Sequence, residues 1–264
     1  MKTTRGYVDS DWGQIHYART GTGPTCVFFH ESPQSIRSFD ATLPLMANRL
    51  DAIALDTPGY GCSAQPPHDR FDIPDYAARL LQAIDNLGVE RFAVSGVHTG
   101  ASIAVEVARQ AGMGRISHAV LSGVPLLSEA ERQQYLADWS PKMAPDADGS
   151  HLRWAWERYE RVWGADSDPT LLHLASTQIL NVLDRYEWAY NAAFRYDPAP
   201  TLPGLTCPVL LLDAEHDLLA KYDEPSAALL PNAEIKIIAG LGGQLPLRVP
   251  QVYADSIADF ICRA

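Results

Sequence analysis

The chain has 264 residues, of which 47% are hydrophobic and 20% are charged, and its formal net charge is -11. This is the composition of a globular protein with enough apolar material for a core, so a mostly disordered chain is excluded. The negative charge repels phosphate backbones and anionic lipids, which argues against nucleic acid and membrane surfaces as partners.

Along the first half of the chain, predicted strands alternate with predicted helices. Short apolar runs bounded by turn residues indicate buried strands, and apolar positions that recur at the helical period indicate helices. We expect strands at 14–18, 25–30, 51–56, 92–95 and 118–122, with helices at 39–47, 76–87 and 100–111. Such alternation predicts an α/β fold with a mostly parallel central sheet flanked by helices.

The alternation stops in the middle of the chain and then resumes. Helical periodicity without a convincing strand covers 130–139, 151–163 and 171–190, and strands follow at 208–212 and 234–238 before a last helix at 251–262. A helical insertion between two halves of one sheet is the simplest interpretation. We therefore expect a core domain formed by 1–127 and 201–264, with 128–200 as an inserted helical cap.

The composition also bears on cofactors and location. The four cysteines (Cys26, Cys62, Cys207, Cys262) form no CxxC pair, the eight histidines show no i,i+4 metal-ligand pair, and no GxGxxG loop follows a predicted strand. No stretch has a signal-peptide core or approaches the ~20 apolar residues of a membrane span. We expect a cytoplasmic protein that uses no metal and no cofactor.

Four short motifs resemble those of the α/β-hydrolase superfamily, and together they extend over almost the whole chain outside the cap. Residues 30–33 read HESP where the family usually has HGxP, and 56–63 read DTPGYGCS, similar to the family's DxxGxGxS loop. Residues 95–100 (SGVHTG) resemble its strand-turn-helix elbow, and 214–217 (AEHD) resemble the loop that bears its catalytic acid. The resemblance implies the α/β-hydrolase fold.

The elbow carries an unusual central residue. In this family it reads GxSxG, because small flanking residues allow a strained turn that lifts the central side chain above the sheet. Gly96 and Gly100 are kept here, but the central residue is His98. A register centred on Ser95 would place the bulky Val97 at a flanking position, so we reject it.

The resemblance also implies a histidine near the C-terminus, and that residue is missing. Residues 240–246 read GLGGQLP, which places Gly243 at the expected histidine position. Without a histidine there, a Ser-His-Asp relay has no base to carry a proton. We therefore expect a site that lacks the standard triad.

Three side chains are candidates for the chemistry. A neutral imidazole at His98, with an unperturbed pKa near ~6.5, suits a general base or acid, and it is also a less common kind of nucleophile. Glu31 replaces the family's usual glycine and either acts as an acid or base or turns into solvent. Asp217 matches the acid position and either orients His98, holds a water or caps a loop. By resemblance, the backbone N–H groups of Ser32 and Thr99 form an oxyanion hole.

The predicted cap is rich in aromatic residues, which suits a hydrophobic or aromatic small-molecule substrate. Because most of these rings must hold the cap to the core, only a few are expected to face the pocket. His151, Trp154 and Arg158 share one helix face at i, i+3 and i+7, so we take them as candidates for substrate binding.

These features predict an enzyme that acts on a small apolar or aromatic ester, lactone or ketone by general-base chemistry from His98, with hydrolysis as the leading reaction. Because a fold does not fix a function, a lyase, a decarboxylase or a cofactor-free oxygenase-like activity stays as the alternative. A non-catalytic receptor that binds a ligand in the capped pocket is the second alternative, with His98 merely filling the elbow. A homodimer through the cap or an edge strand is an open possibility.

Overall fold

The computed structural model describes residues 2–164 and 167–263. Within these residues, eight strands form one sheet in the order β1-β2-β4-β3-β5-β6-β7-β8. The β1/β2 and β2/β4 pairs are antiparallel, and every pair from β4 to β8 is parallel. The mostly parallel sheet with flanking helices confirms the α/β fold expected from the sequence.

The strands and helices have the following bounds. The strands are β1 (Thr4–Ser10), β2 (Gly13–Thr20), β3 (Thr25–Phe29), β4 (Asp51–Leu55), β5 (Phe92–Val97), β6 (Ile116–Ser122), β7 (Val209–His216) and β8 (Ala233–Gly242). The helices are α1 (Leu43–Met46), α2 (Ile73–Asn86), α3 (Thr99–Ala111), α4 (Glu129–Asp138), α5 (Ser150–Trp163), α6 (Pro169–Asn181), α7 (Glu187–Arg195), α8 (Asp223–Leu229), α9 (Leu245–Arg248) and α10 (Pro250–Ile261).

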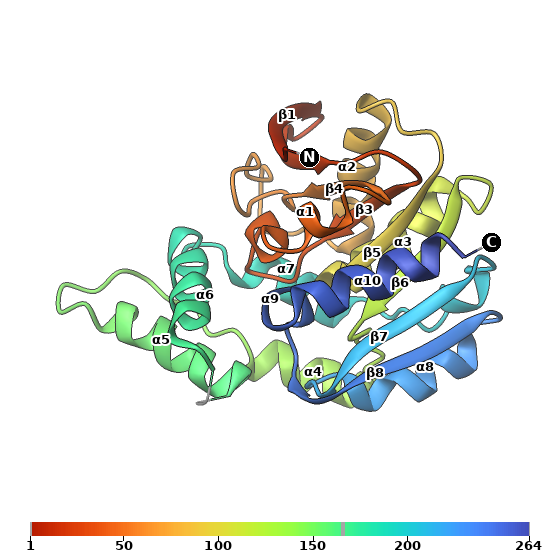
Figure 1. The fold of residues 1–264 in the computed structure, drawn as a ribbon. Coiled ribbons are helices and arrows are strands. Elements are labelled where there is room, and N and C mark those ends of the chain that lie inside the picture. The colour runs from red at the N-terminus through yellow and green to blue at the C-terminus, as the bar shows by residue number, and fades with distance from the viewer. Residues whose placement is uncertain (1, 165–166, 264) are drawn as a thin grey trace.

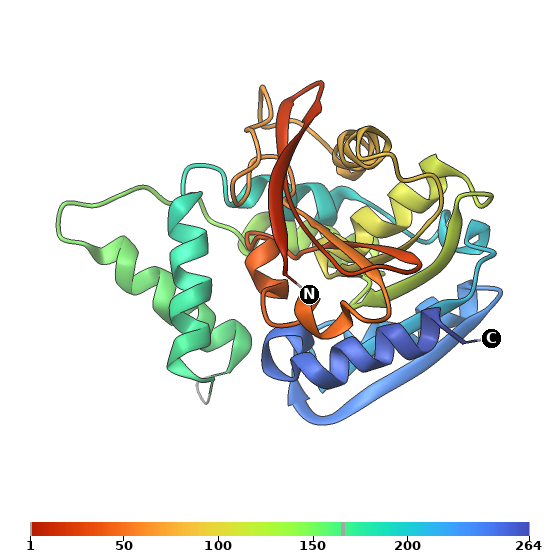
Figure 2. The same ribbon diagram turned by 45° about the horizontal axis from the view of Figure 1, so that its top comes forward.

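Helices cover both faces of the sheet, with α2 and α3 on one face and α1 and α10 on the other (Figures 1 and 2). Strand β3 shows why helices must pack on both faces of the sheet, because it has apolar side chains on each face. Its Val27 and Phe29 belong to the cluster under α2 and α3, whereas Cys26 and Phe28 belong to the cluster under α1 and α10. Successive side chains of a strand point to opposite faces, so a central parallel strand is apolar throughout.

The segment between β6 and β7 holds helices α4 to α7, and α5 and α6 project from the body that contains the sheet (Figure 2). The single helix expected at 171–190 is two helices, because α6 ends at Asn181 and α7 begins at Glu187. Contacts with the core fix this break: Arg185 Nε donates to the Gly59 carbonyl at 2.7 Å, and the Tyr60 hydroxyl accepts the Ala189 N–H at 2.9 Å.

Two further differences lie near the N-terminus. The expected helix at 39–47 is a short 3-10 turn (Ile36–Phe39) followed by α1, in which Pro44 occupies the first turn. Proline has no N–H to donate, so it starts a helix more readily than it continues one. The structure also contains β1, which sequence analysis did not predict; its residues are exposed or only half-buried, so its apolar pattern is weak. In the described part of the chain, no helix has the length and apolar character needed to cross a membrane.

Candidate active site

His98 sits in a sharp turn between β5 and α3, with φ 50° and ψ -111°. This backbone conformation is unfavourable for a residue with a side chain, and such strain concentrates at functional sites. Gly96 and Gly100 make the turn possible: a Cβ at Gly96 would overlap the Gly100 carbonyl, and a Cβ at Gly100 would overlap the carbonyl of Phe29 on β3. Ser95 is fully buried within β5.

We expect Gly100→Ala to destabilise the fold, because its new methyl group meets backbone rather than a side chain that could move aside. Overpacking of this kind costs about 1–3 kcal/mol, and sometimes more. Urea denaturation should show a lower midpoint for this variant. Gly114→Ala is the control, because a Cβ at Gly114 meets no atom within 4 Å; equal midpoints for the two variants would contradict this account of the elbow.

Both ring nitrogens of His98 face carboxylates. Nε2 lies 2.9 Å from Oδ2 of Asp217, and Nδ1 lies 3.2 Å from Oε2 of Glu31. The same Glu31 oxygen accepts a hydrogen bond from Nε2 of Gln244 at 2.8 Å. The structure therefore brings the three candidates for the chemistry together in one line, Asp217–His98–Glu31, with Gln244 at its end.

This arrangement changes the expected protonation of His98. Burial by itself lowers the pKa of His98, but the charge and hydrogen bond of Asp217, together with those of Glu31, raise the pKa well above its usual value. A raised pKa favours the imidazolium form of His98, whose positive charge lies between the two carboxylates. Burial likewise opposes the charge of Asp217, yet His98 and the Leu219 N–H hold the pKa of Asp217 below its usual range.

Two more buried carboxyl groups lie behind this array. Asp213 on β7 and Asp223 at the start of α8 are 2% and 3% exposed, so water screens neither charge. Burial and the neighbouring charges of Asp217 and Asp223 raise the pKa of Asp213 to about 8. Burial and Asp217 raise the pKa of Asp223 to about 7. Sequence analysis did not single out either residue.

We expect the free energy of unfolding to fall as pH rises from about 5 to about 8. A carboxyl group with a raised folded pKa binds its proton more tightly in the folded state, so its contribution is complete below the unfolded value of about 4 and is lost as pH rises through the folded value. Urea denaturation across this range measures the slope. Asp213→Asn, whose amide does not ionise, should flatten it; an identical slope in this variant would rule out the assignment to Asp213.

The two N–H groups expected to stabilise an oxyanion are available. Thr99 is the first residue of α3, so its N–H has no acceptor within the helix. Among the described residues, no hydrogen bond is donated by the backbone N–H of Thr99 or of Ser32. Both residues line the cavities that surround His98.

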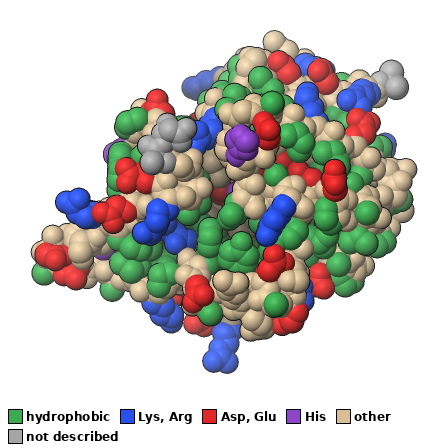
Figure 3. All heavy atoms as spheres, turned by 90° about the horizontal axis from the view of Figure 1, so that it is seen from below, with side chains coloured by type: hydrophobic (Ala, Val, Ile, Leu, Met, Phe, Trp, Pro, Cys, Tyr) green, Lys and Arg blue, Asp and Glu red, His purple; other side chains and the backbone are tan. Residues whose placement is uncertain are grey.

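His98 lies where two cavities meet. The larger has a volume of about 390 Å³ and contains the polar groups Glu31, Asp217 and Arg248. The other is lined mostly by apolar and aromatic side chains. They share His98, Trp139, Tyr190 and Leu218, and a hollow opens on the face seen in Figure 3. A substrate at His98 would thus contact a polar region on one side and an aromatic region on the other.

The structure places the three candidates for substrate binding outside both cavity linings. The His151 ring accepts the Asp146 N–H at 3.0 Å in the loop before α5. Arg158 is 6% exposed and lies over four aromatic rings, among them those of Trp154 and Trp139, with distances of 5.4–5.7 Å to the ring centroids. Arg158 therefore packs against aromatic residues of the 128–200 segment, and His151 contacts the loop before α5.

Gln244, which orients Glu31, is not among the residues predicted from the sequence. Among the described residues, His98 and Gln244 are the two non-glycine residues with positive φ, and they flank Glu31 on either side. The sequence feature that could have identified Gln244 is its place directly after Gly243, the position of the missing histidine. A Cβ at Gly243 would overlap Oδ2 of Asp217, so a side chain there would point at the acid, as the register inferred from the sequence requires.

Comparison with known proteins agrees with the fold. The model of the alpha/beta hydrolase fold family matches residues 24–241. Haloalkane dehalogenase 2 of Mycobacterium tuberculosis is 29% identical over 102 residues, which are 39% of this chain and 36% of that relative. The match thus spans about a third of that enzyme's length. An uncharacterized hydrolase, YugF of Bacillus subtilis, is 25% identical over 93% of this chain and 92% of its own.

The solved structure of a thermophilic esterase from Thermogutta terrifontis has a similar fold. The two structures superpose with a TM-score of 0.79 and 21% sequence identity, over 98% of each chain. At this identity the similarity shows the fold alone.

Proposed function

We infer that this chain, which belongs to the alpha/beta hydrolase fold family, hydrolyses a small apolar or aromatic carbonyl compound such as an ester or lactone. Its relatives include two dehalogenases and proteins named as hydrolases, which supports hydrolysis in general. The observation that carries the finer proposal is the Asp217–His98–Glu31 array at a strained turn beside two free N–H groups.

Glu31 is the base in this proposal. The sequence predicts a neutral His98 in that role. We assign it to Glu31 instead, because the raised pKa of His98 favours an imidazolium, which has no lone pair to accept a proton. The Oε2 atom of Glu31 is held by His98 and Gln244, whereas its buried Oε1 atom has no hydrogen-bond partner among the described residues. With Oε2 occupied, Oε1 is the oxygen left to accept a proton from the water molecule that attacks the carbonyl carbon, and the atoms that now cover Oε1 must move to admit that water.

The remaining groups stabilise the charge that develops. Negative charge forms on the carbonyl oxygen as water adds, and the N–H groups of Thr99 and Ser32 are suited to bind it. The proton taken by Glu31 then passes to the leaving oxygen when the carbon–oxygen bond breaks, so the carboxylate is restored. His98 compensates the charge of Glu31 throughout, and Asp217 fixes the orientation of the imidazolium.

The aromatic cavity suits the apolar part of the substrate. The rings of Tyr135, Tyr190 and Phe194 stack with centroids 5.1 and 6.0 Å apart, and Trp139 lies against them edge-on. An aromatic or branched apolar group gains free energy by leaving water for such a surface. Because Trp139 and Tyr190 line both cavities, a group bound there lies next to His98.

A lyase or decarboxylase is the second candidate, favoured by the absence of a hydroxyl group at the elbow. Incubation of the protein with activated aryl esters and with β-keto acids, followed by product analysis, separates the possibilities. We expect acid and phenol in equal amounts from the esters. Release of CO₂ or carbon–carbon cleavage without ester hydrolysis would assign the lyase reaction, and binding without turnover would assign a receptor.

A further inference from the structure

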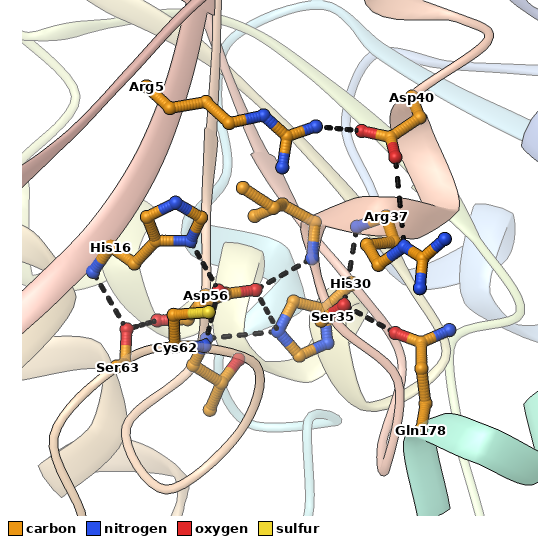
Figure 4. Close-up of polar contacts among 12 residues, drawn as sticks. Arg5, His16, His30, Ser35, Arg37, Asp40, Asp56, Cys62, Ser63 and Gln178 are labelled. Carbon is orange, nitrogen blue, oxygen red and sulfur yellow. Dashed lines mark hydrogen bonds and ion pairs between the residues drawn. The ribbon is translucent and has the colours of Figure 1, made fainter. Parts of the chain in front are cut away.

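A second cluster of reactive side chains lies apart from the active site, where β2 passes the end of β4. His16 on β2, Asp56 directly after β4 and Cys62 in the following loop point toward one another (Figure 4). We propose that these three side chains bind a divalent transition-metal ion of the zinc type. The cavity beside them shares no lining residue with the active-site cavity.

The donor atoms have the right chemistry and spacing. One nitrogen, one carboxylate oxygen and one sulfur lie within 4.8 Å of one another. Imidazole, carboxylate and thiolate are the protein ligands of zinc, which bind at about 2.0–2.3 Å, so small movements toward a shared ion complete the site. A carboxylate and a thiolate together supply two negative charges, which balance the charge of the ion.

Asp56 is already oriented for this role. Its Oδ1 accepts the Ile36 N–H at 2.7 Å, and its Oδ2 accepts the Cys62 N–H at 2.9 Å. Hydrogen bonds that fix a ligating carboxylate are the usual outer layer of a metal site. The Cys62 N–H also holds the loop that carries the thiol next to this carboxylate. The His16 ring is buried, so little side-chain entropy remains to be lost on binding.

Metal binding at this cluster has a defined proton balance. Nδ1 of His16 now lies 2.7 Å from Oδ2 of Asp56. When the ion binds Nδ1, the ring proton moves to Nε2 and the imidazole stays neutral. The Cys62 thiol loses its proton to the solvent as the metal–sulfur bond forms, so each ion bound releases one proton. Affinity therefore rises with pH.

The cluster leaves room for a fourth ligand. A cavity of about 250 Å³ borders all three side chains, and a water molecule there would complete a tetrahedral site. Arg5 and Arg37 line the same cavity, but each is paired with Asp40, at 2.5 and 3.9 Å, which offsets their repulsion of a cation. The bound ion would tie β2 to the loop after β4.

Titration of the reduced, full-length protein with CoCl₂ tests this proposal, because a cobalt–thiolate bond gives a charge-transfer absorption. We expect one equivalent to bind, one proton to be released per ion, and ZnCl₂ to displace the cobalt. Cys62→Ser should lose the charge-transfer band and bind at least about tenfold more weakly. Cys262→Ser, which removes the other exposed cysteine, should behave as wild type.

Either of two results would overturn the proposal. One is the absence of stoichiometric binding by the reduced wild-type protein. The other is equal affinity of wild type and Cys62→Ser for cobalt, which would mean that the ion binds elsewhere. Because Cys62 is exposed, its replacement by serine leaves the core unchanged, and the variant remains informative.

Discussion

Glu31→Gln should lower kcat for ester hydrolysis by about 10²–10⁴-fold, the usual contribution of a general base. The amide keeps the size of the side chain and can still occupy the site between His98 and Gln244, but it cannot accept a proton from water. KM should change little, because the substitution leaves unchanged the aromatic cavity of Trp139 and Tyr190 that we propose for the apolar part of the substrate. Steady-state kinetics on an activated aryl ester measures both constants.

Glu157→Gln is the matched control, because Glu157 is exposed on α5 and lines neither active-site cavity. It should retain wild-type kinetics. If Glu31→Gln also retains wild-type kcat, Glu31 is not the base, and its buried carboxylate serves only to hold the imidazolium.

His98→Ala should lower kcat for ester hydrolysis by about 10²-fold or more, a loss similar to that of Glu31→Gln. Removal of the imidazolium leaves Glu31 and Asp217 as two buried carboxylates without the charge that compensates them. One of them will then take up a proton, because an unpaired buried charge costs several kcal/mol. The variant should therefore lose both the positive charge that compensates Glu31 and the group that orients its carboxylate.

Two observations make the His98→Ala result interpretable. His216→Ala removes another histidine of the larger cavity and should leave kcat within a fewfold of wild type. Binding of a non-hydrolysable substrate analogue, measured by calorimetry, should persist in His98→Ala. Wild-type turnover by His98→Ala would exclude the proposed mechanism. If the wild-type protein binds the analogue but converts no substrate, a receptor is favoured.

The fold was predictable from the sequence because its signals are local. Alternating apolar segments and the glycines at 96 and 100 specify the strands and the elbow, and the structure shows why: a Cβ at either glycine would overlap a backbone carbonyl. The break between α6 and α7 was not predictable, since Arg185 contacts the Gly59 carbonyl, 126 residues away in the chain.

The site was predictable only in part. Position in a motif identified His98, Glu31 and Asp217, but not that Glu31 would turn toward His98. That orientation depends on Gln244, 213 residues away, in a loop whose path no periodicity describes. In the segment between β6 and β7, helical spacing predicts which residues share a face but not what that face contacts. Arg158 on α5 lies over aromatic rings of the same segment.

Glu31, His98 and Asp217 act as one unit in the proposed mechanism, and a double-mutant cycle tests this coupling most directly. The measurement is kcat for ester hydrolysis by wild type, Glu31→Gln, Asp217→Asn and the double variant. Residues that act as a unit give strongly non-additive effects. We predict that the double variant is about as slow as Glu31→Gln alone. Losses that multiply would contradict the account, because they would mean that the two carboxylates contribute independently.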